Sequence, residues 1–359
     1  MNIAIDVTPL ETGHAGRGIG VYTQLLIDAL QSYEKEHTYT LFTRGQNEPK
    51  NIDLVHYPYF DPFFLTLPLH KPKPTVVTVH DLIPLVFPDE FPAGLRGNVK
   101  WQIQKLSLRG ALRIISDSES SKKDIVSITD INAQKIDVVY LAPSDVFKPI
   151  KNKTNLDVVK KKYHLPNQFI LYVGDVNWNK NILGMLKAFQ KVKCGNQEII
   201  RNVKLVLVGK AFLDASLQET QQINSFIDTV GLNKEVMMIG SVPMDDLAAI
   251  YNLASVYIQP SFYEGFGLPV LEAMACGCPV VTSDTSSLAE IAGPAILINP
   301  NNIDSIPKGT AKALLLSNIE RNQLIQKQFR WVERFTWERV ARETVRVYAK
   351  VLAKKDDRA

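Results

Sequence analysis

Two glutamates, Glu264 and Glu272, are the residues of this chain best placed to carry out chemistry. A Gly-Phe-Gly turn follows Glu264, and the segment after it has a proline near its start and a glycine, Gly277, where its apolar periodicity stops. Proline suits the first turn of a helix and glycine suits the position just beyond its end. The sequence therefore predicts a helix that starts at Gly267-Leu268. The unpaired N–H groups and positive dipole end of that helix would bind an anion.

The two carboxylates lie on either side of this expected anion site. Glu264 is in the loop just before the helix, and Glu272 is about one turn inside it. Carboxylates accept hydrogen bonds from hydroxyl groups, so a phosphate at the helix start would have a hydroxyl-binding group on each side. A sugar nucleotide presents this combination of phosphate and hydroxyls. A carboxylate near a helix start also serves simply to compensate the dipole, and the residues alone leave both interpretations open.

The same stretch resembles a family motif. Two Glu residues with seven residues between them, the first followed by Gly-Phe-Gly and the second by Ala-Met-Ala-Cys-Gly, are similar to the motif of retaining glycosyltransferases of family four (group 1). The resemblance covers the chain from Asn2 to about Trp337. It implies a GT-B fold, an α/β architecture in which two doubly wound Rossmann-like domains face a central cleft. Within this family it is strongest with bacterial mannosyl- and rhamnosyltransferases of surface-polysaccharide synthesis.

The elements that position these residues alternate between strands and helices in the first half. Alternation of this kind indicates a parallel sheet covered on both faces. The predicted strands are Asn2–Val7, Tyr39–Phe42, Leu54–His56, Thr75–Thr78, Arg113–Ser116 and Ile136–Val139, and the predicted helices are Gly20–Gln31, Leu95–Arg109 and Ser118–Ser127.

The second half repeats a different device, a buried strand that ends in glycine. Phe169–Gly174 and Val203–Gly209 follow this pattern, which places loops at the carboxyl ends of the strands, where ligands bind in open sheets. Further strands are predicted at Val236–Ile239, Val256–Gln259 and Val280–Ser283. We expect a first domain over residues 1–150, a second over 151–335, and a last helix over 336–359 that returns to the first domain, as the resemblance implies. Residues 142–168 are polar and proline-containing, which predicts a linker followed by a surface turn.

Two glycine-rich turns and a lysine complete the expected donor site. Gly18 opens a helix after the first strand, and Gly174 ends the first strand of the second half, where the backbone can approach a phosphate closely. Lys180 follows Gly174 by six residues and can reach a phosphate. The family pattern usually has Arg-Lys here, but this chain has Asn179 before Lys180, so one phosphate contact is missing or is supplied by another residue such as Arg17.

The resemblance assigns the remaining roles. His80, at the end of a strand, matches a histidine at the rim of the cleft and would fix the donor sugar, while Glu264 would position the reacting carbon and Glu272 would bind the ribose. The loop around Val242 would contact the nucleobase. His80 and Glu264 are therefore the expected catalytic residues, and the donor-binding set is Gly18, Gly174, Lys180, Val242, Gly265, Phe266, Gly267, Leu268 and Glu272. His56, at the end of the preceding strand, is the next candidate histidine.

Composition limits the alternatives. The 359 residues are 45% hydrophobic and 22% charged, as in globular proteins, and the net charge is +4. The sequence contains no stripe of basic residues with interleaved aromatic residues, the pattern that would indicate nucleic-acid binding. The three cysteines lack metal-ligand spacing, and no apolar run has the length of a membrane span. The first segment is typical of a buried strand rather than of a signal peptide. Together these features predict a cytoplasmic protein. The helix Leu95–Arg109 and the aromatic loop Tyr57–Leu65 leave peripheral contact with the inner membrane face open.

The expected reaction is retaining transfer of a hexose from a nucleoside-diphosphate sugar to a hydroxyl of a saccharide or lipid-linked acceptor. The resemblance alone favours GDP-mannose as the sugar donor. No Asp-x-Asp pair occurs, so we expect neither a metal nor a cofactor; Lys180, the helix start and backbone N–H groups would stabilise the diphosphate. Three alternatives stay open: a sugar-nucleotide epimerase, a phosphorylase on the same fold, and a non-catalytic nucleotide-sugar-binding protein.

Overall fold

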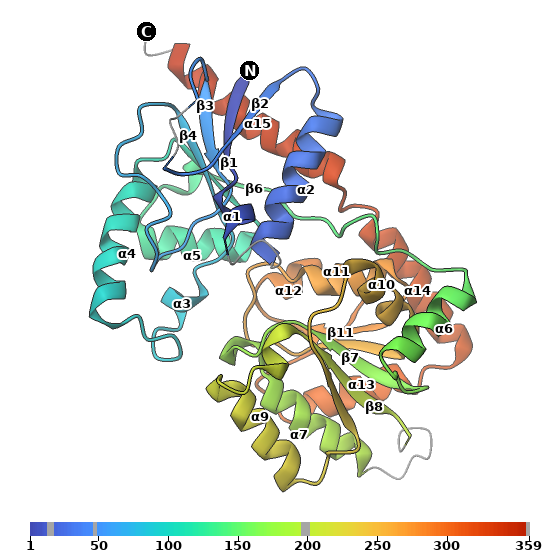
Figure 1. The fold of residues 1–359 in the computed structure, drawn as a ribbon. Coiled ribbons are helices and arrows are strands. Elements are labelled where there is room, and N and C mark those ends of the chain that lie inside the picture. The colour runs from blue at the N-terminus through green and yellow to red at the C-terminus, as the bar shows by residue number, and fades with distance from the viewer. Residues whose placement is uncertain (13–17, 46–48, 195–201, 357–359) are drawn as a thin grey trace. The chain divides into compact units, whose positions relative to one another are not determined.

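The computed structural model describes residues 1–12, 18–45, 49–194 and 202–356. Two compact units make up the chain. The first contains Met1–Ala142 together with Phe335–Ala359, and the second contains Pro143–Arg334. Each unit is built on a six-stranded, wholly parallel sheet with helices on both faces (Figure 1). The α/β fold class predicted from the alternation of strands and helices is therefore confirmed.

The first unit has the strand order β2-β1-β3-β4-β5-β6. Every residue of β3 and β4 is buried, as expected for central strands covered on both faces. The strands are β1 Asn2–Asp6, β2 Thr38–Phe42, β3 Leu54–Tyr57, β4 Thr75–Val79, β5 Arg113–Ser116 and β6 Ile136–Val138. All six are within two residues of their predicted ends.

The helices of the first unit include the last helix of the chain. They are α1 Thr8–Glu11, α2 Gly18–Tyr33, α3 Ile83–Val86, α4 Gly94–Arg109, α5 Glu119–Thr129 and α15 Trp337–Asp356, with a short 3-10 turn at Ala133–Lys135. Helix α15 packs against α2 and against β4 and β5. Its Tyr348 is fully buried. The chain thus returns to its first unit after the second unit is complete.

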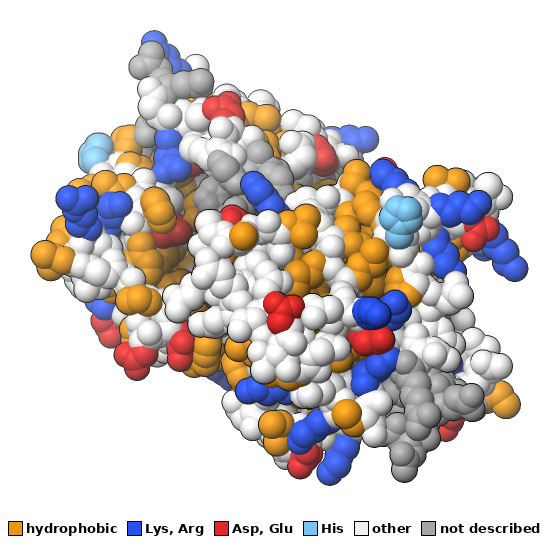
Figure 2. Space-filling view, turned by 60° about the horizontal axis from the view of Figure 1, so that its bottom comes forward, with side chains coloured by type: hydrophobic (Ala, Val, Ile, Leu, Met, Phe, Trp, Pro, Cys, Tyr) orange, Lys and Arg blue, Asp and Glu red, His pale blue; other side chains and the backbone are white. Residues whose placement is uncertain are grey.

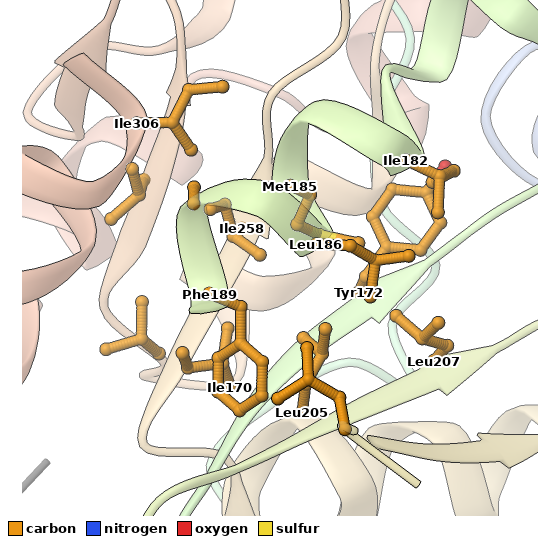
Figure 3. Packing of buried hydrophobic residues seen from close by; sticks show 14 of the residues in the cluster. Ile170, Tyr172, Ile182, Met185, Leu186, Phe189, Leu205, Leu207, Ile258 and Ile306 are labelled. Atoms are coloured by element: carbon orange, nitrogen blue, oxygen red, sulfur yellow. The ribbon is translucent and has the colours of Figure 1, made fainter. Parts of the chain in front are cut away.

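The second unit has the strand order β12-β11-β10-β7-β8-β9. Figure 3 shows its core, in which Ile170 and Tyr172 of β7 and Leu205 of β8 pack against Leu186 and Phe189 of α7. The strands are β7 Phe169–Val173, β8 Lys204–Val208, β9 Val236–Ile239, β10 Val256–Gln259, β11 Val280–Ser283 and β12 Ile296–Ile298. The helices are α6 Lys153–Lys162, α7 Ile182–Lys193, α9 Gln218–Thr229, α10 Met244–Leu253, α11 Leu268–Ala275, α12 Ser286–Ile291, α13 Ser305–Leu314 and α14 Asn318–Val332, with short 3-10 turns at Trp178–Lys180 and Lys210–Leu213.

Most helices of the second unit were not predicted, and α6 and the strand β12 illustrate the reasons. Residues 142–168, expected to be a linker and a surface turn, contain the helix α6, whose first turn is capped by the side chain of Asn152 through the N–H of Thr154. Only three of its ten residues, Leu156, Val158 and Val159, are apolar, so the polar and Lys-rich composition outweighed the helical spacing of Leu156 and Val159 in the prediction. The edge strand β12 was not predicted, because three residues are too few for a pattern.

The distribution of surface charge and the lengths of the helices concern two possible partners, nucleic acid and membrane. Figure 2 shows one face of the molecule, on which Lys and Arg side chains are scattered among acidic and neutral ones rather than gathered in a stripe. Among the described residues, no helix combines the length and the apolar character that crossing a membrane requires.

Candidate functional site

The carboxylate of Glu264 is the centre of a buried polar cluster in the second unit. Its side chain is 7% exposed. Oε1 accepts hydrogen bonds from Gln259 Nε2 at 2.9 Å and from Ser261 Oγ at 2.7 Å. The ammonium group of Lys180 lies 2.9 Å from Oε1 and 2.7 Å from Oε2. Lys180, predicted to bind the diphosphate, and Glu264, predicted to bind the donor sugar, therefore form one ion pair.

Lys180 reaches Glu264 from the 3-10 turn Trp178–Lys180, which follows β7. The neighbouring Asn179 is 3% exposed and donates from Nδ2 to the Tyr263 carbonyl at 2.9 Å. In return, the Asn179 carbonyl accepts from the N–H of Phe262 at 2.7 Å. The residue that stands where the family pattern has arginine thus holds the loop before Glu264 in place.

A segment of hydroxyl residues after β11 supports the same loop from its other side. Ser286 Oγ accepts from the Glu264 N–H at 3.0 Å. Ser287 Oγ donates to the carbonyls of Glu264 and Phe266 at 2.8 and 2.9 Å. Sequence reasoning missed this segment, although a run of hydroxyl residues between a buried strand and a short helix was a visible signal. Its effect is to fix the backbone from Phe262 to Phe266.

The helix α11 begins where the sequence predicted. The residue just before it, Gly267, adopts a left-handed conformation with φ of +105°. A Cβ atom at this position would lie 2.6 Å from Leu288 Cδ2, so only glycine fits. Gly267 offers no side chain to cap the helix. In the first turn Pro269 has no N–H and the Val270 N–H donates to the Gly267 carbonyl at 3.0 Å, so the Leu268 N–H is the first-turn donor that the helix start offers to a ligand. With the dipole, this makes the start of α11 a site for negative charge.

Glu272 lies one turn further along α11 and is partly buried. Its Oε2 accepts a hydrogen bond from the Tyr251 hydroxyl of α10 at 3.0 Å. Burial raises the pKa of Glu272 to about 7, and the Tyr251 hydrogen bond opposes this rise only in part. The residue can therefore change its charge near neutral pH.

His80 follows β4 in the first unit, and both of its ring nitrogens face hydrogen-bond acceptors. Nδ1 lies 2.6 Å from Asp117 Oδ2, and Nε2 lies 3.1 Å from the Pro58 carbonyl. Burial by itself lowers the pKa of His80, but the charge and hydrogen bond of Asp117, together with Asp81, outweigh it and raise the pKa above the usual value. Asp117 is 2% exposed, and its Oδ1 has no hydrogen-bond partner. Sequence analysis did not identify Asp117 as a partner of His80.

His56, the second candidate histidine, has a structural place. Its ring is fully buried and lies 2.7 Å from the Tyr348 hydroxyl and 2.8 Å from Thr78 Oγ1. Burial lowers the pKa of His56 to about 3, which keeps the ring neutral. It connects β3 to α15 and has no access to solvent.

The remaining predicted residues lie at the ends of strands or helices. Gly174 follows β7, where a Cβ would lie 2.7 Å from the Tyr172 hydroxyl. Val242 is partly exposed in the loop between β9 and α10. Gly18 is exposed as the first residue of α2, and Arg17, named as a possible substitute phosphate contact, lies outside the described residues.

The structure thus gathers Lys180, Glu264 and the Gly265–Leu268 turn into one hydrogen-bonded site in the second unit, and Glu272 lies one turn further along the same helix. His80 and Gly18 belong to the first unit. Among the described residues, the one group of side chains spaced to hold a metal ion is Glu34, Glu36 and His37, also in the first unit. It lies in the loop after α2 and contains none of the predicted site residues.

Comparison with known proteins gives this geometry a context. Residues 156–331 match the family model described as glycosyl transferases group 1, and residues 46–142 match glycosyltransferase family 4. The chain is 32% identical over 301 residues to the O-antigen chain mannosyltransferase B of Escherichia coli, covering 82% of this chain and 75% of that protein.

Two further proteins are similar over most of this chain. The serotype-specific mannosyltransferase WbdA of Escherichia coli is 27% identical over 81% of this chain, but the chain spans only 35% of that longer protein. Among solved structures, Anabaena Alr3699/HepE in complex with UDP-glucose superimposes with a TM-score of 0.74 at 16% identity, over 98% of this chain and 100% of that one.

Proposed function

Because this chain belongs to the group 1 family of glycosyltransferases and its two units have the GT-B fold, we propose that it transfers mannose from GDP-mannose, with retention of anomeric configuration. The acceptor is a hydroxyl group of a saccharide or of a lipid-linked saccharide, and the reaction contributes to the synthesis of a surface polysaccharide in the cytoplasm. The mannosyltransferase from Escherichia coli that is 32% identical to this chain supports the choice of sugar.

The Lys180–Glu264 ion pair at the start of α11 is the observation that carries this proposal. A donor diphosphate at the helix start would draw the Lys180 ammonium group to itself, and Glu264 would then accept hydrogen bonds from donor-sugar hydroxyls. Gln259 and Ser261 hold Glu264 in place through this exchange, because both bind Oε1 independently of Lys180. The Lys180 ammonium group and the start of α11 would then stabilise the negative charge that develops on the diphosphate as it leaves.

Retention would follow a front-face route. A phosphate oxygen of the departing diphosphate assists deprotonation of the acceptor hydroxyl, and the acceptor attacks the face that the diphosphate leaves. Glu272 binds the ribose, the Val242 loop contacts the base, and His80 fixes the sugar. The charge on the diphosphate is met by Lys180 and the positive dipole end of α11, so this proposal needs neither a metal ion nor a cofactor.

The first experiment identifies the donor. Thermal unfolding is measured with GDP, UDP, ADP, dTDP and their sugar conjugates, first in EDTA and then with Mg²⁺ added. A ligand that binds the folded state alone raises the midpoint by mass action, and we expect the largest rise with GDP-mannose. A rise with another base would overturn the donor, and a dependence on Mg²⁺ would overturn the metal-free site.

The second experiment tests catalysis. We expect Glu264→Gln to lower turnover of the identified donor by about 100-fold or more, the size of effect seen when one preorganised group of this kind is lost. Glu235→Gln is the matched control, because it breaks a comparable ion pair, Lys193–Glu235 at 2.8 Å, outside the predicted site. Near wild-type turnover in Glu264→Gln would remove the role given to this residue. The anomeric configuration of the product, measured by NMR coupling, decides between retention and inversion.

A further inference from the structure

A line of buried hydrogen bonds leads from the core of the second unit to one oxygen of Glu264. It starts at Tyr257 and passes through Gln259, both on the strand β10. The Tyr257 hydroxyl donates to Gln259 Oε1 at 2.7 Å, and Gln259 Nε2 donates to Glu264 Oε1 at 2.9 Å. All three residues are buried, and we call their side chains the β10 network. Tyr257 is the one member that has no role in the proposed reaction.

Gln259 is a polar residue in a strand that is buried throughout. The strand β10 lies between β11 and β7, where both faces of the sheet are covered. Tyr257 and Gln259 stand two positions apart, which places their side chains on the same face. A buried amide is stable when both its oxygen and its N–H groups find partners. Tyr257 and Glu264 supply these partners from opposite ends, and the amide is held between them.

Charge fixes the direction of these two hydrogen bonds. The carboxylate of Glu264 accepts and does not donate, so Gln259 must turn its nitrogen towards Glu264 and its oxygen towards Tyr257. Burial is the largest of the effects that raise the pKa of Tyr257 well above its usual value, so the hydroxyl keeps its proton and donates. Hydrogen bonds in such a line polarise one another and strengthen as a set. The loss of the Tyr257 hydroxyl would therefore be felt at the carboxylate.

The two oxygens of Glu264 have different partners. Oε1 accepts from Gln259 Nε2 and from Ser261 Oγ, and Lys180 Nζ lies 2.9 Å away. Oε2 faces Lys180 Nζ at 2.7 Å. When a donor diphosphate draws Lys180 to itself, Oε1 keeps its two neutral donors, and Oε2 is released to accept a hydrogen bond from the sugar. The last torsion of a glutamate side chain is soft, so the donors on Oε1 decide where Oε2 points.

We propose that Tyr257 is a positioning residue for the glycosyl transfer. Acting through Gln259, it anchors Oε1 of Glu264 so that Oε2 is the oxygen that faces the donor sugar beside its reacting carbon. The inference rests on the proposed function for the reaction itself. It adds to that function a residue that never touches the donor, and it gives the two carboxylate oxygens separate tasks.

Steady-state kinetics tests the assignment on whichever sugar conjugate of GDP, UDP, ADP or dTDP stabilises the wild-type protein most. Tyr257→Phe keeps the ring and removes the first hydrogen bond of the network. We expect kcat to fall about tenfold, the factor that one hydrogen bond of ordinary strength is worth. Affinity for the nucleoside diphosphate alone should stay unchanged, because Oε2 contacts only the sugar. A general loss of structure would weaken nucleotide binding as well, so the two measurements separate positioning from folding.

Tyr348→Phe is the matched control. It removes a hydroxyl whose partner lies at the same distance, 2.7 Å, from a ring that is equally buried but belongs to the first unit. We expect this variant to lose stability and to keep the kcat of the wild-type protein. Equal kcat in Tyr257→Phe and wild-type protein would overturn the positioning role. A wild-type protein without turnover on any of these donors would instead overturn the proposed function.

A measurement without any donor tests the network itself. Gln259→Glu places a second carboxyl group against Glu264 Oε1, and because Lys180 balances only one of the two charges, the pair retains a proton in the folded state. The folded-state pKa of the pair is then raised, so stability present at low pH is lost as pH rises through it. Denaturant unfolding should show a larger loss between pH 5 and pH 8 than in the wild-type protein or in Gln222→Glu, at an exposed position of α9. Equal losses in all three proteins would overturn the contact between Gln259 and Glu264, and the positioning role with it.

Discussion

At the scale of single residues, Glu272 couples the predicted ribose site to pH. The carboxyl has a pKa of about 7 in the folded chain against an ordinary value of 4.5. Between these two values the folded state holds a proton that the unfolded state has lost. Stability must therefore fall as pH rises through this window and become flat above it. The full effect of such a shift is at most about 3 kcal/mol.

The variant Glu272→Gln has no proton to lose at this position. Denaturant unfolding at pH 5 and pH 8 should show that the wild-type protein loses up to about 3 kcal/mol relative to the variant over this interval. Subtracting the variant cancels the titration of all other groups that the substitution does not touch. If the difference between the two proteins is the same at both pH values, Glu272 does not titrate in this range.

The pair of His80 and Asp117 leads to a second prediction at this scale. Asp117 is the main group that raises the His80 pKa against the effect of burial. Replacing it by asparagine removes the negative charge and keeps the shape, so the pKa of His80 should fall. Titration of the histidine ring protons by NMR measures this directly. His56 serves as an internal reference, because its low pKa keeps it neutral from pH 5 to 8.

A His80 resonance that titrates alike in wild-type protein and Asp117→Asn would show that Asp117 does not set its charge. Activity alone would not distinguish this, because a misplaced ring also lowers turnover.

Sequence reasoning found the residues of the site more easily than their partners. Glu264, Lys180 and the Gly265–Leu268 turn were predicted, since each stands at a recognisable position after a strand or before a helix. Their direct pairing was not predicted, because Lys180 and Glu264 are 84 positions apart in the chain. Asp117 was missed for the same reason, being 37 positions from His80. Sequence pattern reports local structure, and these partners meet only through the fold.

At the scale of elements, the start of α11 depends on one glycine. Gly267→Ala places a Cβ 2.6 Å from Leu288 Cδ2 and forces an L-residue into a backbone with φ of +105°. Together these should cost roughly 2–4 kcal/mol and displace the helix start, so nucleotide binding should weaken along with stability. Chemical denaturation and a nucleotide titration measure the two effects.

Gly231→Ala is the control for this substitution. Its φ is +70°, but a Cβ there has no atom within 4 Å. This variant should therefore lose about 1 kcal/mol of stability from the left-handed backbone conformation alone, and its nucleotide binding should be unchanged. Equal losses in the two variants would mean that contact with Leu288 does not matter.

Elements whose ends are marked by local glycine or proline residues were predicted well, and elements that lack such marks were not. Helix α11 was predicted because its glycine and proline signals are local. Helix α6 was missed because only three of its ten residues are apolar, and β12 was missed because three residues carry no periodicity. Helix α6 packs against α10 and β12 pairs with β11, so the structure of both comes from the neighbours they pack against.

At the scale of the whole molecule, the chain crosses between its two units twice, near Ala142 and near Arg334. The first unit is therefore incomplete until the last helix has been made. The C-terminal segment contributes a buried face to α2 and the hydroxyl of Tyr348 to His56. Stability of the first unit must depend on residues almost three hundred positions from its central strands.

Removing the Tyr348 hydroxyl tests this dependence. In Tyr348→Phe the ring still fills its place, but the Nδ1 atom of the fully buried His56 loses the partner that lay 2.7 Å away. An unpaired buried polar group costs about 1–3 kcal/mol. Hydrogen exchange in urea, followed by mass spectrometry of peptides from each unit, should therefore show earlier opening of β3 and α15, while peptides from β7 and β10 exchange as in the wild type. Tyr33→Phe, at a side chain that is 51% exposed, should change neither unit. If Tyr348→Phe exchanged like Tyr33→Phe, the buried hydrogen bond would contribute nothing, and shape alone would hold the last helix on the first unit.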